Sequence, residues 1–228
     1  GGVYDLAQPT HVSALSLGNV RVNSLANLAV TNRTLSDAAY QDSLAIAATS
    51  AGSRLAFANP ALIAAGASGN VGVTAAAAGS LVDTITLGFV SNANGVAGLA
   101  NANLSSGTVA VTGAAYDLAS PSLGATSVGF GKVRVGATST VSLTNAVVTS
   151  SSYQDSLVTT ANPSSGKLSA SVPGALLAGD VGNVGVTAAK AGVLTGSVSL
   201  GYLSNANGVT GLANATLASG SLAVSGTA

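Results

Sequence analysis

The residue types that most often carry out chemistry in proteins are scarce in this chain. There is one histidine, His11, there is no cysteine, and all seven acidic residues are aspartates. A serine hydrolase needs a base held beside its nucleophile, and a zinc site needs several cysteine or histidine ligands. We therefore expect no catalytic residue, no cofactor and no metal ligand, and we predict that the chain is not an enzyme. His11 is expected to have a surface or packing role.

One loop loosely resembles a calcium-binding loop. The stretch Ser91–Gly95 reads Ser-Asn-Ala-Asn-Gly and contains no carboxylate. Ca²⁺ prefers several anionic oxygens, whereas asparagine offers only a neutral carbonyl. Because Asn and Gly are the residues that most readily adopt positive φ in hairpins, the pattern favours a hairpin turn over a calcium site.

A long internal repeat organises the whole chain. Three segments recur, the first two at an offset of 113 residues and the third at 112: Tyr40–Leu44 at Tyr153–Leu157, Asn70–Ala76 at Asn183–Ala189, and Tyr4–Ala7 at Tyr116–Ala119. A repeat of this length has the size of an independent β-sandwich domain. We predict two domains, residues 1–113 and 114–228, joined without a flexible linker, and we expect them to belong to a longer array.

The local pattern within each copy predicts strands. Stretches such as Thr138–Thr144 and Gly196–Tyr202 alternate apolar residues with hydroxyl residues. Such alternation is typical of half-buried strands, and turn residues divide each copy into about seven to nine of them. The chain is rich in Val, Thr, Ser, Asn and Gly, which suits strands and tight turns. The predicted fold class is all-β, with two tandem immunoglobulin-like β-sandwich domains.

Three charged positions are shared by the two copies: Asp5 with Asp117, Arg21 with Arg134, and Asp42 with Asp155. Duplication of these residues suits architecture better than catalysis. We hypothesise that each arginine pairs with an aspartate of its own copy, or caps backbone groups at the joint, because its guanidinium can form forked hydrogen bonds.

Two pairs of tyrosines are also shared, Tyr4 with Tyr116 and Tyr40 with Tyr153. Aromatic residues make up only 4% of the chain, and a sandwich usually places such large side chains in its core or at a domain joint. We expect that placement, and platforms for sugar stacking are the alternative.

The chain carries very little charge. Charged residues are 6% of the total, and the formal net charge is zero. No basic surface is therefore predicted for nucleic acid, and no apolar run is long enough for a membrane-spanning helix. Exposed strand edges are usually guarded by Lys, Pro or inward-pointing charges, and this chain has three lysines. We expect the chain to associate with further copies of itself.

One stretch resembles a known family. Residues Ser127–Asn145 are similar to the opening strands of the choice-of-anchor D family and related bacterial β-strand repeat proteins, whose pattern is roughly F-G-x-V-x-V-G-x-T-x-T-x-x-L-T-N. The first copy carries a degraded form in Leu17–Asn23 and Leu28–Asn32. The resemblance implies an immunoglobulin-like sandwich of the Hydin/PapD-like kind, in a large secreted or cell-surface bacterial protein, with no catalytic residues to transfer.

The repeat, the composition and the resemblance together predict a structural role. We expect an extracellular stalk or self-assembling filament or sheath in which successive sandwiches provide length. The alternative is an adhesin module that binds a glycan or a host protein through loops such as Asn92–Leu99.

Overall fold

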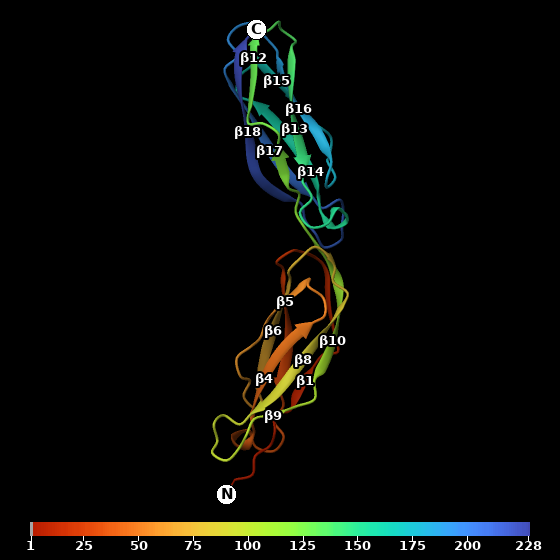
Figure 1. The fold of residues 1–228 in the computed structure, drawn as a ribbon, viewed down its shortest axis with the longest axis vertical. Helices are drawn as coiled ribbons and strands as arrows, with labels where there is room; N and C mark the ends of the chain where they lie inside the picture. Colours follow the sequence, from red (N-terminus) through yellow and green to blue (C-terminus); the bar gives the residue numbers. More distant parts are fainter. Residues whose placement is uncertain (1) are drawn as a thin grey trace. The chain divides into compact units, whose positions relative to one another are not determined.

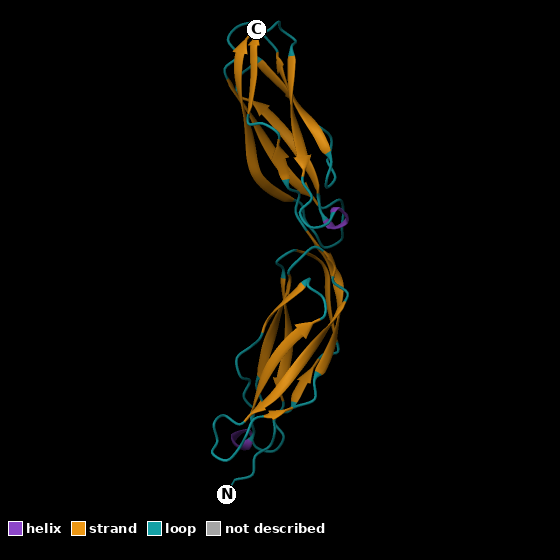
Figure 2. Cartoon of the chain, in the orientation of Figure 1, coloured by secondary structure: helices purple, strands orange, loops and turns teal. Residues whose placement is uncertain are grey.

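The computed structural model describes residues 2–228 and contains two all-β, immunoglobulin-like sandwiches in tandem (Figure 1, Figure 2). The chain divides into two compact units, Gly1–Ala115 and Tyr116–Ala228, which we call module 1 and module 2. The division lies two residues beyond the boundary drawn from the sequence, inside one continuous strand, Gly107–Tyr116. Within residues 2–228 no helix is long and apolar enough to cross a bilayer.

The two modules share the same main strands in the same order, and module 1 has two further short strands, β7 and β9. Module 1 consists of β1 (Pro9–His11), β2 (Ala14–Arg21), β3 (Leu25–Asn32), the 3₁₀ turn η1 (Ala38–Tyr40), β4 (Ser43–Ser50), β5 (Leu55–Ala58), β6 (Ser68–Ala75), β7 (Gly79–Ser80), β8 (Asp83–Asn92), β9 (Ala102–Asn103) and β10 (Gly107–Tyr116). Module 2 consists of β11 (Pro121–Leu123), β12 (Ser127–Lys132), β13 (Thr138–Asn145), η2 (Ser151–Tyr153), β14 (Ser156–Pro163), β15 (Leu168–Ser171), β16 (Val181–Ala188), β17 (Gly196–Asn205) and β18 (Ala215–Thr227).

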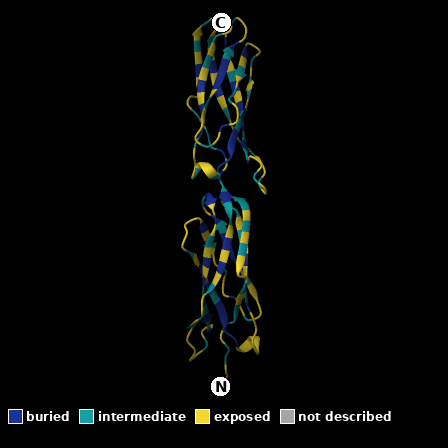
Figure 3. Cartoon of the chain, turned by 90° about the vertical axis from the view of Figure 1, so that its right-hand side faces the viewer, coloured by how far each residue is buried: buried dark blue, intermediate teal, exposed yellow. Residues whose placement is uncertain are grey.

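Each module is two facing sheets. In module 1 the sheets have the orders β1-β3-β6-β5 and β2-β10-β8-β4, and in module 2 the orders are β11-β13-β16-β15 and β12-β18-β17-β14. Buried and exposed residues alternate along the strands (Figure 3). In β3, for example, Leu28 and Val30 are buried while Ala29 between them is exposed. The predicted alternation is confirmed, and small aliphatic side chains fill both cores.

Loops from the same module guard the strand edges. In module 1, Leu44 of the edge strand β4 exchanges two backbone hydrogen bonds with Ile63, and Asn59 Oδ1 accepts from Ala48 N at 3.0 Å. In module 2, Leu157 of β14 pairs in the same way with Leu176, and the strand ends at Pro163. Loops of the same module therefore occupy part of the outer edge of these two strands, and association with further copies stays a prediction.

The second strand of module 2 and its last strand run parallel. β12 pairs with β18 from Ser127↔Ala223 to Lys132↔Thr227, with a bulge after Gly129. Gly226 adopts a φ of 149°, and a Cβ there would lie 2.7 Å from Phe130 Cβ and 3.0 Å from the Gly131 carbonyl. Gly113 of module 1 has the matching φ of 150°, and its Cβ would lie 2.6 Å from the Gly18 carbonyl. Both modules thus require glycine at the point where the last strand lies against the second strand.

The variant Gly226→Ala should destabilise module 2 by about 2 kcal/mol, because the added methyl meets backbone atoms and the φ is strained for an L residue. Urea unfolding followed by hydrogen exchange mass spectrometry measures each module separately. Gly129→Ala is the matched control, since a Cβ there comes no closer than 4.0 Å to Ser225 Oγ. Equal stability of the two variants would contradict this reason for glycine.

The cores differ in polarity at one cross-strand pair. Module 1 places Ile46 opposite Phe89, whereas module 2 places Thr159 opposite Tyr202. Both hydroxyls of the second pair are buried without a hydrogen-bond partner among residues 2–228. Burial also raises the pKa of the Tyr202 phenol above its ordinary value of 10.0. An unpaired buried hydroxyl lowers stability, so module 2 carries a defect that module 1 lacks.

Tyr202→Phe should stabilise module 2 by about 1 kcal/mol at neutral pH. Because the pKa of the Tyr202 phenol is raised in the folded state, the phenol ionises more easily in the unfolded state. The stability of module 2 therefore falls as the pH rises above about 10, and the stability gained by Tyr202→Phe should be larger in alkali than at neutral pH. The measurement is urea unfolding at neutral and alkaline pH. The reverse change, Phe89→Tyr, should destabilise module 1, and a neutral outcome for both changes would refute the assignment.

Candidate functional site: the polar clasp where the chain enters each module

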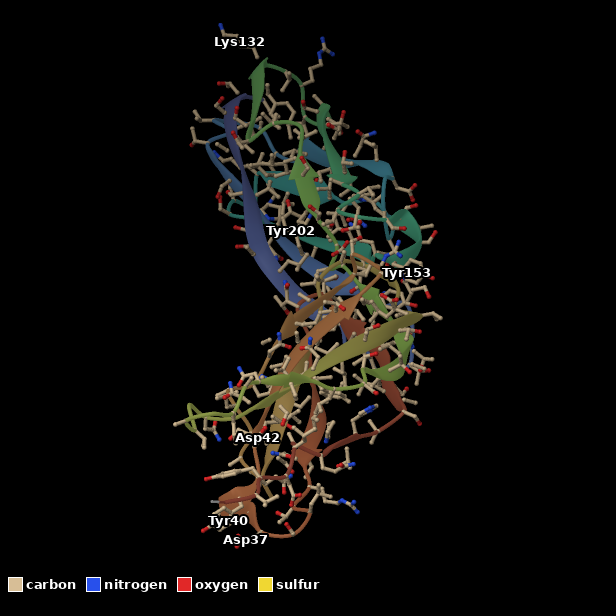
Figure 4. All side chains as sticks on the ribbon, turned by 60° about the horizontal axis from the view of Figure 1, so that its bottom comes forward. Asp37, Tyr40, Asp42, Lys132, Tyr153 and Tyr202 are labelled. Carbon is tan, nitrogen blue, oxygen red and sulfur yellow. The ribbon has the colours of Figure 1, made fainter. Side chains whose placement is uncertain are left out.

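Each module begins with a short segment that docks on the end of its own sandwich. We call Tyr4–Ala7 and Tyr116–Ala119 the leading segments. Asp5 forms a parallel bridge with Gln41, in which Asp5 N donates to Tyr40 O at 2.8 Å and Asp42 N donates to Asp5 O at 3.0 Å. The bridge between Asp117 and Gln154 in module 2 repeats both bonds, at 2.9 and 3.1 Å. Figure 4 marks Tyr40 and Asp42 at this end of module 1.

A buried serine and aspartate hold the end of the leading segment. Ser91 Oγ donates to Asp42 Oδ2 at 2.7 Å and accepts from Ala7 N at 2.8 Å. Ser91 is 0% exposed and Asp42 is 5% exposed. The carboxylate only accepts hydrogen bonds, so it orients the serine hydroxyl and leaves the serine lone pairs for the backbone N–H of Ala7.

A buried asparagine completes the attachment. Asn32 Nδ2 donates to the carbonyls of Asp42 and Ile63 at 2.9 and 3.1 Å. Its Oδ1 accepts from Gln8 N at 2.8 Å and from Gln41 Nε2 at 3.2 Å. All four hydrogen-bonding positions of this amide are used, although the side chain is 0% exposed. Such a satisfied network rigidifies its surroundings.

We call Asn32, Gln41, Asp42 and Ser91 the polar clasp of module 1. Module 2 repeats it as Asn145, Gln154, Asp155 and Ser204. The serine bonds have the same lengths there, 2.7 Å to Asp155 Oδ2 and 2.8 Å from Ala119 N. In both modules the glutamine also bonds the backbone, Gln41 to Arg33 O and Leu35 N and Gln154 to Ala146 O and Val148 N.

The tyrosines shared by the copies form ring pairs beside the clasp. Tyr4 meets Tyr40 edge to face, with centroids 5.6 Å apart and planes at 66°, and Tyr116 meets Tyr153 at 5.4 Å and 56°. All four tyrosines lie outside the buried core, and Tyr40 is 48% exposed. The rings therefore pack the leading segment against the 3₁₀ turn, and a place at the joint stays a prediction.

The structure gives Asp42 and Asp155 serine partners that the sequence reasoning missed. Arg21 lies half-buried at the end of β2, and Arg134 is exposed just after β12. The hypothesis that these arginines pair with an aspartate of their own copy stays a prediction. The sequence did hold a signal for the serine and asparagine, because Ser91 and Asn32 recur at the same offset on strands that otherwise bury apolar residues.

The attachment of the leading segment is less complete in module 2 at one atom. Ser36 Oγ donates to Asp5 Oδ2 in module 1. The residue in the position of Ser36 is Thr149, and Asp117 Oδ2 is buried without a hydrogen-bond partner among the described residues. A buried carboxylate oxygen without a partner is unfavourable, so the leading segment of module 2 lacks a stabilising hydrogen bond that module 1 has.

The other candidate residues have packing or turn roles. The ring of His11 lies 5.8 Å from that of Phe89, and His11 Nδ1 is 2.8 Å from Val12 O. Asn94 and Gly95 have φ values of 54° and 74°, as predicted, within a loop that joins β8 to β9. No group of three or more His, Cys, Asp or Glu side chains between residues 2 and 228 is arranged to hold a metal ion.

Comparisons with known proteins do not identify a family. No family model matches the chain, and no curated protein matches it. Solved structures with a similar arrangement include the D00-D0 domain of intimin (13% identity, 94% of this chain and 99% of that chain, TM-score 0.35) and domains 4 and 5 of the S-layer protein SbsC (13% identity, 100% of both chains, TM-score 0.33). The titin Ig tandem domains A164-A165 are also similar (10% identity, 97% and 98%, TM-score 0.26).

Ser204→Ala should destabilise module 2 by about 3 kcal/mol, because it leaves Ala119 N and Asp155 Oδ2 buried without this partner. Hydrogen exchange in urea should show early loss of protection at residues 116–120. Ser199→Ala is the matched control on the same strand, where the serine is exposed. If both variants unfold at the same urea concentration, the clasp does not stabilise the module.

Proposed function

We propose that the chain is a load-bearing pair of modules in a secreted or surface-attached bacterial protein, where successive sandwiches form a stalk or filament. The resemblance of Ser127–Asn145 to the choice-of-anchor D family supports the extracellular setting. Duplication of the clasp supports an architectural role, because the same buried contacts recur wherever the chain enters a module.

The parallel pairing of β12 with β18 is the observation that carries this proposal. The chain enters β12 at its first residue and leaves β18 at its last. Tension along the chain therefore pulls these neighbouring strands in opposite directions along their common axis. The ladder from Ser127↔Ala223 to Lys132↔Thr227 is then loaded in shear, so its hydrogen bonds share the force instead of breaking one by one.

Module 1 has the same load path. Ser13 O accepts from Ala110 N near one end of β2, and Gly113 closely approaches Gly18 further along both strands. Residue numbers thus increase in the same direction on β2 and β10. The leading segment lies ahead of this ladder on the chain, so the hydrogen bonds that join it to the polar clasp take up the load first.

An adhesin is the second candidate function. It is favoured by two hollows of about 320 and 340 Å³ in module 1, which lie on either side of Phe89 and Leu104. The second hollow is lined by His11 and by Ser105 and Ser106. A glycan array probed with the chain tests this alternative, and selective binding that is lost in Leu104→Asp would support it.

Single-molecule force spectroscopy tests the load-bearing role. Pulling the chain by its two ends should give two unfolding events, each releasing roughly 3.5 Å per residue of a module. Because the chain has no cysteine, handles can also be attached at Ser127→Cys and Ala223→Cys, two exposed partners at one end of the ladder. Pulling there opens the bonds one at a time and should need several-fold less force. Equal forces in the two geometries would refute the proposed load path.

A further inference from the structure

The two tyrosine pairs place neighbouring phenol rings at the surface of each module. The ring centroids of Tyr4 and Tyr40 are 5.6 Å apart, and those of Tyr116 and Tyr153 are 5.4 Å apart. Tyr40 is 48% exposed, and the other three rings are half-buried. Figure 4 marks Tyr40 and Tyr153, one in each module. Both pairs therefore combine close ring contact with access from the solvent.

In module 1 the ring carbons that can couple lie beside one point. A Cβ built at Gly2 would lie 3.3 Å from Tyr4 Cε2 and 3.6 Å from Tyr40 Cε1. The Cε carbons of a tyrosine adjoin the carbon that carries the hydroxyl, and they are the positions at which two oxidised phenols join. Glycine leaves the space between these two carbons free of a side chain.

The orientation of the rings also suits coupling. The joined rings of dityrosine are twisted about the new bond, because the hydroxyls beside that bond crowd each other. The ring planes already meet at 66° in module 1 and at 56° in module 2. Side chains at the surface reorient within nanoseconds, so ordinary side-chain motion can supply the remaining approach of the rings.

We propose that Tyr4 with Tyr40, and Tyr116 with Tyr153, are sites of oxidative coupling to dityrosine, with a haem peroxidase and hydrogen peroxide as the class of oxidant. Each phenol gives up one electron and one proton, and the resulting radical is shared between its oxygen and its Cε carbons. Two radicals join through a new Cε–Cε bond, and the hydrogen on each joined carbon then moves to the phenol oxygen. The peroxide takes up the two electrons and two protons and leaves as two molecules of water.

The link fixes the leading segments in a chain that has no cysteine and therefore no disulfide. It closes the loops 4–40 and 116–153, which contain the first three strands of each module. A closed loop restricts the unfolded chain, as a disulfide does, so each linked module resists unfolding more strongly. The proposal goes beyond the load-bearing role and does not depend on it.

Oxidation of the whole chain by a haem peroxidase and hydrogen peroxide tests the proposal. Two groups tethered in one chain have an effective concentration of roughly millimolar or more, so at about one micromolar chain the links within a module should exceed links between chains on the order of a hundredfold. Mass spectrometry of proteolytic fragments should find the two proposed links, each lacking two hydrogen atoms. Tyr202 is 6% exposed and should stay unlinked. The linked chain should unfold at a higher urea concentration.

Phenylalanine variants are the matched controls, because they keep the ring and remove the phenol. Tyr40→Phe should lose the link and the added urea resistance of module 1 and keep both in module 2, and Tyr153→Phe should do the reverse. Oxidation of the unfolded chain in concentrated urea should lose this selectivity. The proposal is overturned if the folded chain stays unlinked, if its five tyrosines couple at random, or if links form only between chains. The pulling experiment uses unoxidised chains, so failure of the coupling and failure of the load path are distinguishable.

Discussion

The hydrogen-bonding demand of four buried polar side chains determines how the chain enters each module. Asn32 and Ser91 have no access to water, so every donor and acceptor they carry must be matched within the protein. The leading segment supplies the missing backbone groups through Ala7 and Gln8. The leading segment is therefore part of the end of the sandwich, and the buried hydrogen bonds of the clasp fix the path of the chain ahead of β1.

The low charge of the chain does not leave every strand edge open to pairing. On the edge strands β4 and β14, the backbone groups of Leu44 and Leu157 are occupied by Ile63 and Leu176 of the same module, so a neighbouring chain cannot pair there. Association through bare strand edges is thus restricted on this side of each sandwich.

The two modules show how much variation one topology accepts. The pair Ile46–Phe89 becomes Thr159–Tyr202, and Ser36 becomes Thr149, while strand order and clasp are retained. The three buried side-chain oxygens without partners among the described residues all lie in module 2. At the matching positions, module 1 has the apolar side chains of Ile46 and Phe89, and Ser36 donates a hydrogen bond to Asp5. The two modules therefore differ in how many buried polar atoms are unpaired, whereas the clasp keeps the same hydrogen bonds in both.

The sequence by itself determined the all-β class, the alternation of buried and exposed residues, the turn at Asn94 and Gly95, and the near-equivalence of the two halves. These features depend on local propensity and on periodicity, which are visible along the chain. It did not reveal the partners of Asp42 and Asp155, or the buried role of Asn32, because those residues meet across 49 and 31 positions of sequence from three separate strands and loops. Tertiary structure decided these contacts, since only the folded sandwich brings a polar strand end, a serine on the opposite sheet and the incoming chain to one water-free place.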